Sequence, residues 1–365
     1  MDKVIAGFGE VMLRLCPPGR QRFAQALPGT LQATFGGGEA NVCASVAMLG
    51  GKARFLTALP DNTVARALVA QLRGLGCDVS RIHYTEEGRM GVYYAELGSN
   101  MRGSSVLYDR EGSVVASLPL EAYDFGSMLE GVGHLHLTGI TPALSRNAFE
   151  VTHALALKAV EKGITLSVDL NYRKKLWNWE AGTPKRRLAE RCMEKIVSVA
   201  NFIIGNEEDA LDVFGIGASG IDVESGKLNA DGYQEVAERL AQRFPHAKFI
   251  AFTLRESYSA DHNNWGGMIY DCQSKATHFA PMDDNGCYVP YQIHSIVDRF
   301  GGGDSFCAGL LFALHTPELA APETAIRFAV AASALKHTCY GDFNYSTRCE
   351  VENLMRGFAS GRVQR

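Results

Sequence analysis

The chain has 365 residues, enough for one large domain or two ordinary ones. Its 36 basic and 40 acidic residues nearly balance, so neither nucleic acid nor an anionic membrane is expected as a partner. The nine cysteines are scattered without a C-x-x-C pair, which favours a reduced protein over a disulfide framework. No apolar run reaches membrane-spanning length and no signal-peptide pattern opens the chain, so we expect a cytoplasmic protein.

Short apolar runs alternate with helix-like patterns along most of the chain, beginning with residues 4–8. That first run ends in Gly7-Phe8-Gly9, but Met12 replaces the third glycine of the dinucleotide-binding fingerprint, so that kind of site is not expected here. Alternating strands and helices are typical of a parallel sheet with helices on both faces. We therefore predict an α/β fold.

Two segments do not follow this rhythm. Residues 12–34 are rich in Pro, Gly and Arg, and residues 91–117 alternate apolar and polar positions, so together they predict a small antiparallel sheet. We assign residues 1–11, 35–90 and 118–365 to an α/β core, and residues 12–34 and 91–117 to a β-sheet lid. Residues 215–232 are expected to form a surface insertion, and residues 258–294 a meander of short strands and loops.

Four polar runs each follow directly after a predicted strand: residues 138–142, 171–174, 206–209 and 298–304. In parallel sheets, ligands bind at the carboxyl ends of the strands. The four runs should therefore meet at one edge of the sheet and form a binding site.

The last of these runs contains Gly301-Gly302-Gly303-Asp304 and leads into a helix pattern. Backbone N–H groups at such a helix start, together with the helix dipole, can hold an anion. A carboxylate beside a bound anion costs free energy, and one reason for Asp304 to be there is to accept a proton from a group that attacks phosphorus. The alternative is that Asp304 only caps the helix and the glycines only form a tight turn.

Two further groups of residues would serve phosphoryl transfer. Asn206, Glu207 and Asp209 carry oxygen atoms that could order a hydrated Mg²⁺ through its water molecules. Arg110 and Arg173 could hold an acidic substrate, because a guanidinium binds a carboxylate with two parallel hydrogen bonds. The alternatives are that the acidic residues favour a helix N-terminus and that the arginines lie on the surface. The chain has neither G-x-x-x-x-G-K-[ST] nor the protein-kinase signatures, which excludes those two classes.

Two stretches resemble the signatures of the ribokinase-like (PfkB) carbohydrate kinases: Gly37-Gly38-x-x-Asn41-x-x-Ala44 and Asp298-x-x-Gly301-Gly302-Gly303-Asp304-Ser305-Phe306. The resemblance implies a three-layer α/β/α sandwich with a mostly parallel central sheet and a small β-sheet lid. It also implies ATP, Mg²⁺ and an acceptor with a primary alcohol. Asp304 would be the catalytic base, Gly301 to Gly303 the anion hole, and Gly37, Gly38 and Asn41 part of the acceptor site. A monovalent cation such as K⁺ is a further candidate cofactor, and a homo-oligomer is expected, with a dimer through the lids as the candidate form.

Within the family, several stretches are similar to kinases of the sugar acid 2-keto-3-deoxygluconate. They are Gly91-Val92-Tyr93, Tyr108-Asp109-Arg110, residues 137–144 and Asp169-Leu170-Asn171-Tyr172-Arg173. The residues that this similarity assigns to the sugar acid are Tyr93, Tyr108, Arg110, Ile140 and Arg173.

The chain departs from the family pattern at three places. Gly302 stands where the glycine loop usually has Ala, and Asp209 stands where the N-x-x-E metal motif has Glu. A K-x-G-like turn near the nucleotide is replaced by residues 253–257, Thr-Leu-Arg-Glu-Ser. The residues expected to contact the nucleotide are Asn206, Thr253, Arg255, Gly301 and Gly303.

The function that these observations predict is ATP-dependent phosphorylation of a sugar acid, with 2-keto-3-deoxygluconate and its 6-phosphate as the leading substrate and product. A kinase for a neutral sugar, such as fructose or ribose, or for another keto-deoxy acid remains an alternative. A catalytically silent sugar-binding regulator is an alternative of a different class.

Overall fold

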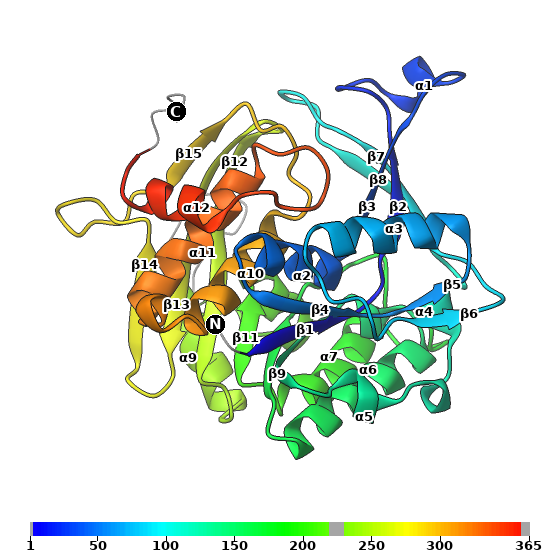
Figure 1. The fold of residues 1–365 in the computed structure, drawn as a ribbon. Coiled ribbons are helices and arrows are strands. Elements are labelled where there is room, and N and C mark those ends of the chain that lie inside the picture. Colours follow the sequence, from blue (N-terminus) through cyan, green and yellow to red (C-terminus); the bar gives the residue numbers. More distant parts are fainter. Residues whose placement is uncertain (1–2, 219–229, 359–365) are drawn as a thin grey trace.

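The computed structural model describes residues 3–218 and 230–358, except for the side chains of residues 207, 230 and 231. Its centre is a nine-stranded, mostly parallel sheet (Figure 1). The strands, in spatial order, are β14 (Ala276–Ala280), β13 (His262–Asp271), β12 (Phe249–Ser259), β11 (Phe202–Gly205), β10 (Thr165–Asp169), β9 (Val132–Thr138), β1 (Val4–Phe8) and β4 (Lys52–Leu56), with β15 (Tyr291–His294) paired to β13. The run from β12 to β4 is parallel throughout, while β13, β14 and β15 are antiparallel additions.

Helices cover both faces of this sheet, as the alternation of patterns predicts (Figure 1). One face is covered by α4 (Val114–Ser117), α5 (Phe125–Met128), α6 (Arg146–Glu161), α7 (Lys185–Val197), α8 (Glu207–Phe214) and α9 (Ala230–Arg243). The other face is covered by α2 (Gly38–Met48), α3 (Thr63–Gly74), α10 (Gly302–Leu314), α11 (Pro322–Lys336) and α12 (Arg348–Met355). Short 3₁₀ turns lie at η1 (Leu120–Ala122), η2 (Thr141–Ala143) and η4 (Pro317–Leu319). Within the described residues, none of these helices combines the length and apolar character needed to cross a membrane.

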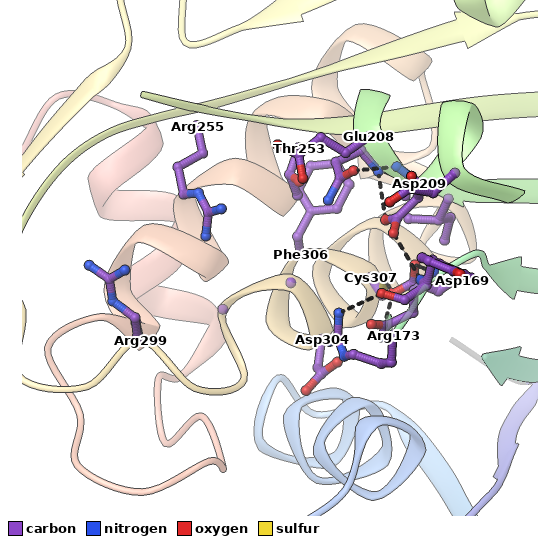
Figure 2. A pocket seen from close by; sticks show the side chains of 18 of the residues that line it. Asp169, Arg173, Glu208, Asp209, Thr253, Arg255, Arg299, Asp304, Phe306 and Cys307 are labelled. Atoms are coloured by element: carbon purple, nitrogen blue, oxygen red, sulfur yellow. Dashed lines mark hydrogen bonds between the residues drawn. The ribbon is translucent and has the colours of Figure 1, made fainter. Parts of the chain in front are cut away.

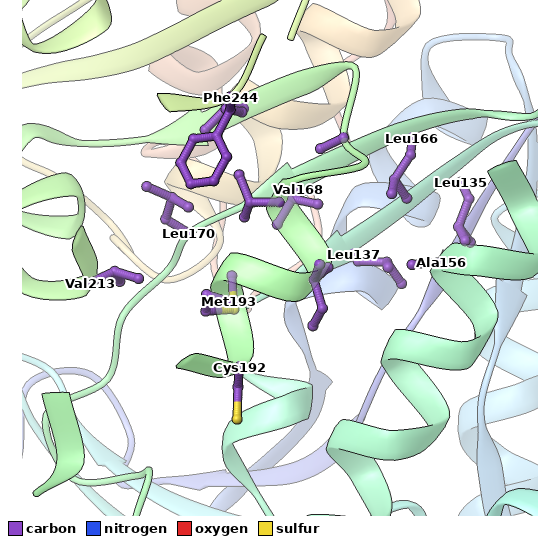
Figure 3. Packing of buried hydrophobic residues seen from close by; sticks show 14 of the residues in the cluster. Leu135, Leu137, Ala156, Leu166, Val168, Leu170, Cys192, Met193, Val213 and Phe244 are labelled. Atoms are coloured by element: carbon purple, nitrogen blue, oxygen red, sulfur yellow. The ribbon is translucent and has the colours of Figure 1, made fainter. Parts of the chain in front are cut away.

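The sheet separates two hydrophobic cores because successive side chains of a strand point to opposite faces. In β11, Ile203 joins the core under α6 and α7, while Phe202 and Ile204 join the core under α10 and α11. Figure 3 shows part of the first core, in which Leu137 of β9 and Met193 of α7 are both fully buried. The central sheet, its two helical layers and the separate small sheet confirm the predicted fold class.

The small sheet consists of β3 (Gln32–Gly36), β2 (Met12–Cys16), β7 (Gly91–Glu96) and β8 (Ser105–Asp109), in that order. The two outer pairs are antiparallel as predicted, but the antiparallel prediction is wrong for the central pair, β2 and β7, which is parallel because these strands are not joined by a hairpin. Figure 1 shows this lid sheet standing away from the central sheet beyond α3, with α1 (Phe23–Ala26) at its far end. A third, two-stranded sheet joins β5 (Ala58–Pro60) to β6 (His83–Thr85). The exact boundaries between core and lid stay a prediction.

The Gly7-x-Gly9 pair at the end of β1 has a structural cause. A Cβ on Gly7 would lie 2.9 Å from Cys43 Sγ, and one on Gly9 would lie 2.1 Å from Glu39 Oε2. Both glycines therefore allow α2 to pack directly against the end of β1. Glu39, buried at this contact, accepts hydrogen bonds from the Thr138 and Thr141 hydroxyls, which join α2 to the loop after β9.

Two segments were predicted to lack long strands or helices, residues 258–294 and 215–232. The expected meander at 258–294 is wrong in its first part, because β12 continues to Ser259 and forms a long antiparallel hairpin with β13. Pairing with β13 supplies hydrogen-bond partners to residues whose polar side chains obscure the strand pattern. The predicted insertion at 215–232 falls largely on residues 219–229, which lie outside the described part of the chain.

Candidate active site

A cavity of about 680 Å³ opens at the carboxyl ends of the parallel strands, beside the start of α10 (Figure 2). Its lining includes parts of the polar runs after β10 and β11 and before α10, as the topology predicts. The predicted site residues in its lining are Tyr108, Arg110, Arg173, Asn206, Asp209, Thr253, Arg255, Gly301, Gly302, Gly303 and Asp304.

The remaining acceptor-site residues gather around Asp304 on the side of α2. Asn41 Nδ2 donates a hydrogen bond to Asp304 Oδ2 at 2.6 Å, and Asn41 Oδ1 accepts one from the Gly37 N–H at 3.3 Å. A Cβ on Gly38 would lie 3.7 Å from Asp304 Oδ1 and 3.8 Å from Ile140 Cδ1. The two glycine clusters, far apart in sequence, therefore meet at one carboxylate.

Asp304 has an environment suited to a base. Burial raises the pKa of Asp304 from 3.8 to about 6, although the hydrogen bond from Asn41 and the charge of Arg173 act to lower it. A carboxylate with that pKa is mostly ionised at neutral pH, yet it binds a proton more strongly than an exposed aspartate. Asp304 also sits in the first turn of α10 without capping it, since the N-cap is Gly301.

The glycine loop before Asp304 has a specific steric explanation. Gly301 has φ +78°, and a Cβ there would lie 2.1 Å from the backbone oxygen of Asp342. A Cβ on Gly302 would lie 3.1 Å from His337 Cε1, so this side chain occupies the space that the usual alanine would use. Gly303 has open space around it and is exposed at the cavity. Because the first N–H groups of a helix have no acceptor within it, this end of α10 can bind an anion.

Asn206 and Asp209 form a capping box at the start of α8. Asn206 Oδ1 accepts from the Asp209 N–H at 2.7 Å, and Asp209 Oδ2 accepts from the Asn206 N–H at 3.2 Å. Asp209 Oδ1 accepts from the Tyr172 N–H at 2.8 Å, and burial raises the pKa of Asp209 to about 6.

These contacts bear on the predicted metal site. Among residues 3–218 and 230–358, no three His, Cys, Asp or Glu side chains come together as a metal-binding group. The side chain of Glu207 lies outside the described part of the structure. Because the oxygen atoms of Asn206 and Asp209 already accept backbone hydrogen bonds, they fit a hydrated Mg²⁺ held through water better than direct coordination.

The two arginines predicted for an acidic substrate differ in their surroundings. Arg110 lies at the cavity, but its Nε donates to Glu10 Oε2 at 2.8 Å, so its charge is matched by a buried carboxylate. Arg173 is exposed at the cavity, and its charge lowers the pKa of Asp169, Asp209 and Asp304 against the larger effect of burial. Figure 2 shows Arg173 beside Asp169 and Asp304.

Tyr93 lies outside the cavity lining. Tyr93 is on β7 of the lid sheet and its ring is buried. Its hydroxyl donates to Asp342 Oδ2 at 2.7 Å. Tyr108, by contrast, lines the cavity, and the Arg110 guanidinium lies 5.3 Å from the centre of its ring.

Among the polar residues of the cavity that the sequence predictions did not assign to the site, Arg299 and Asp169 matter most. Arg299 lies with Arg255 at one end, and the pKa of Arg299 is lowered by burial and by the neighbouring charge of Arg255 (Figure 2). Two guanidiniums this close suit a polyanion such as a polyphosphate. Asp169 lies at the other end, where burial, Asp209 and Asp304 raise the pKa of its carboxyl. Asp169 is the last residue of the apolar strand β10, and that position was an available signal, whereas Arg299 follows Asp298 in the loop before α10 and has no comparable signal.

Comparisons with known proteins agree with this geometry. The family model of pfkB family carbohydrate kinases matches residues 5–243. A 2-dehydro-3-deoxygalactonokinase of Haloferax volcanii is 30% identical over 99% of both chains. The crystal structure of a 2-dehydro-3-deoxygluconokinase of Thermotoga maritima is 35% identical, covers 97% of this chain and 100% of its own, and has a TM-score of 0.86. A fructokinase of Salmonella typhimurium is 26% identical over 93% of this chain and 95% of its own. The chain therefore belongs to the pfkB family of carbohydrate kinases.

Proposed function

We propose that this carbohydrate kinase transfers the γ-phosphoryl group of ATP to the terminal hydroxyl of a 2-keto-3-deoxy sugar acid, with 2-keto-3-deoxygluconate as the leading acceptor. The observation that carries the proposal is the position of Asp304. Its carboxylate is held by Asn41 at the start of α10, directly after the glycine loop. A hydroxyl bound there would face both a base and an anion site.

Each part of the site has a role in this reaction. Asp304 accepts the proton of the attacking hydroxyl, and the amides at the start of α10 stabilise the charge on the transferred group. Mg²⁺, held through water near Asn206 and Asp209, would neutralise charge on the phosphate oxygens. Arg255 and Arg299, with Thr253 on β12, would contact the phosphates at the far end of the cavity.

The acidic acceptor is supported by cavity charge and by relatives. Arg173 is exposed at the cavity within electrostatic range of Asp304, so it can pair with the carboxylate of an acceptor whose hydroxyl reaches that base. Arg110 keeps N–H groups beyond those that pair with Glu10 and can add to this contact. Two relatives are named as kinases of 2-dehydro-3-deoxy acids. One is a 2-dehydro-3-deoxygalactonokinase and the other a 2-dehydro-3-deoxygluconokinase.

A neutral sugar is the second candidate. The pairing of Arg110 with Glu10 removes much of one positive charge from the cavity, and a fructokinase is among the relatives. A neutral acceptor would leave the exposed guanidinium of Arg173 without a charged partner from the substrate, which makes this candidate weaker.

An ADP-release screen tests both candidates. The purified chain, with ATP and Mg²⁺, is offered 2-keto-3-deoxygluconate, its C4 epimer, fructose and ribose in separate reactions. We expect kcat/KM for the keto-deoxy acids to exceed that for fructose at least ~10-fold, because an acceptor without the carboxylate leaves Arg173 unpaired. Preference for fructose would reject the acidic acceptor, and no ADP release with any compound would reject the kinase assignment of the site.

A further inference from the structure

Four charged side chains lie buried beneath the glycine loop: Arg14, Asp298, Lys336 and Asp342 are 0%, 1%, 0% and 7% exposed. Arg14 Nη2 lies 2.8 Å from Asp298 Oδ2, and Arg14 Nη1 donates to Asp342 Oδ1 at 2.8 Å. Lys336 Nζ donates to the Cys339 backbone oxygen at 3.1 Å, within electrostatic range of both carboxylates. The set thus contains two cations and two carboxylates.

The two carboxylates shape the loop that carries the anion site. Asp298 Oδ1 accepts from the Phe300 N–H at 3.1 Å, and Asp298 Oδ2 accepts from the Gly341 N–H at 3.1 Å. The backbone oxygen of Asp342 occupies the space that a Cβ on Gly301 would need, and Gly301 has a left-handed φ of +78°, so the loop packs directly on Asp342. Movement of either aspartate would therefore move the amides next to Asp304.

Arg14 reaches these carboxylates from β2 of the lid sheet, far away in sequence. Its guanidinium lies 4.6 Å from the ring centre of Phe300 and 5.4 Å from that of Tyr340, so aromatic faces complete its surroundings. Burial lowers the pKa of Arg14, but Asp342 and Asp298 more than compensate and raise it, so the side chain stays charged.

This arrangement does not fit a monovalent cation at the same place. A cation such as K⁺ bound by the carboxylates beneath the loop would compete with Arg14, which already pairs with both of them. A second cation beside Arg14 and Lys336 would leave an unbalanced charge in a site without exposure to water.

We propose that Arg14 is a built-in cation for the glycine loop: it is a positioning residue that holds Asp298 and Asp342 beneath Gly301, so that the reaction needs no monovalent metal ion there. The inference rests on the proposed phosphoryl transfer. It also makes the lid strand β2 part of the support for the anion site, because the same side chain belongs to both.

The first test uses the unmodified chain. ADP release is measured with the preferred acceptor and MgATP, with K⁺ or with tetramethylammonium as the sole monovalent cation at matched ionic strength. Equal kcat in the two media is expected. Activity that depends on K⁺ overturns the built-in cation and leaves the kinase assignment intact, whereas no activity in either medium rejects the proposed function itself.

The second test removes the guanidinium. Arg14→Ala should lower kcat at least ~10-fold, because a displaced anion site misplaces the phosphoryl group. Guanidinium at low concentration, or K⁺, should restore part of that loss and raise the melting temperature of Arg14→Ala by binding the vacated carboxylates. Arg54→Ala is the matched control, because it also removes the arginine partner of an aspartate, Asp78 at 2.6 Å, and the other hydrogen bonds of Arg54 go to the Met128 and Glu130 backbone and not to the glycine loop.

Rescue of Arg14→Ala, without any cation effect on Arg54→Ala, supports the inference. Full activity of Arg14→Ala in tetramethylammonium overturns it, and so does a loss of kcat that neither cation relieves in a folded variant. If Arg14→Ala does not fold, Arg14→Lys keeps the charge and is expected to fold with unchanged KM for ATP and reduced kcat, with no K⁺ activation. A K⁺-activated Arg14→Lys would contradict the proposal.

Discussion

Asp304 is buried and accepts a short hydrogen bond from Asn41. Burial raises the pKa of its carboxyl, and the hydrogen bond lowers it. Replacement by asparagine keeps the shape but removes the proton acceptor. We expect Asp304→Asn to lose at least ~10²-fold in kcat, with little change in KM for ATP. Asp212→Asn is the control and should keep its activity, because Asp212 also lines the cavity but pairs with Arg186 and Lys174. Near-normal turnover by Asp304→Asn would show that the carboxylate is not the base.

The raised pKa of Asp304 also predicts how the contribution of this carboxyl to stability changes with pH. A carboxyl whose pKa is higher in the folded than in the unfolded state contributes stability that is present below about pH 3.8 and lost as the pH rises through about 6. Asp304→Asn should therefore melt at the same or a higher temperature than the parent chain at pH 8. A lower melting temperature would mean that the carboxylate stabilises the fold.

The same pKa predicts how the rate depends on pH. Because the ionised form accepts the proton, kcat/KM for the acceptor should rise with pH through about 6 and level off above it. Arg173 lowers the pKa of Asp304, so Arg173→Ala should shift this rise to higher pH. Steady-state rates between pH 5 and pH 8 check both statements, and a flat profile over that range would contradict the assigned pKa.

Replacing Arg173 tests the acidic acceptor more directly than replacing Arg110. We expect Arg173→Ala to raise KM for the sugar acid at least ~10-fold, since a charge-assisted contact is lost, and to change KM for ATP far less. Arg110→Ala should do the same but should also destabilise the fold, because Glu10 would be left buried without its partner. Equal changes in KM for both substrates would count against a role in acceptor binding.

At the scale of elements, the contact between α2 and β1 positions the acceptor side of the site. Gly9→Ala would force a Cβ against Glu39 and should lower the free energy of unfolding by ~1–3 kcal/mol. Gly74→Ala, exposed at the end of α3 with open space around it, should instead raise it by ~0.4–1 kcal/mol. Urea unfolding of the two variants measures the difference, and equal values would mean that α2 can shift without cost.

The strands differ in how clearly their own residues predict them. Apolar runs indicated the parallel strands, most clearly β1 and β11, which are apolar over their whole length. They missed the second half of β12, where the strand exists through pairing with β13 and not through its own composition. Likewise, the N-x-x-D pattern was interpreted as a metal motif, but the same spacing places Asn206 and Asp209 in a capping box.

At the scale of the whole molecule, the location of the site was predictable, and its internal pairings were not. Strand ends that follow one topology must meet, so Asp304 and Asn206 could be assigned to one cavity from the sequence. The pairing of Arg110 with Glu10 joins residues 100 positions apart, and no local pattern reports such a contact. Side-chain partners across the lid and the core depend on the assembled fold.

The predicted homo-oligomer concerns the whole molecule, and the lid sheet is its candidate interface. On the lid, β8 is an edge strand, and its Leu107 is 66% exposed, a combination that favours pairing with a second copy. We expect light scattering to give a mass about twice 39.7 kDa, and Leu107→Asp to reduce it to that of one chain. Leu157→Asp, on the exposed side of α6, is the control and should leave the mass unchanged. A monomeric parent chain would refute the lid dimer.

The hydrogen bond from Asn41 to Asp304 joins positions 263 residues apart, and this distance has a consequence for biosynthesis. On the ribosome, α2 emerges early, whereas the proposed base and the helix that carries it emerge only when most of the chain has been made. β1, also early, lies between β9 and β4 in the finished sheet, so the first strand must wait for later ones. A truncated product that ends before residue 304 would lack the proposed base and α10, so it should release no ADP by the proposed reaction.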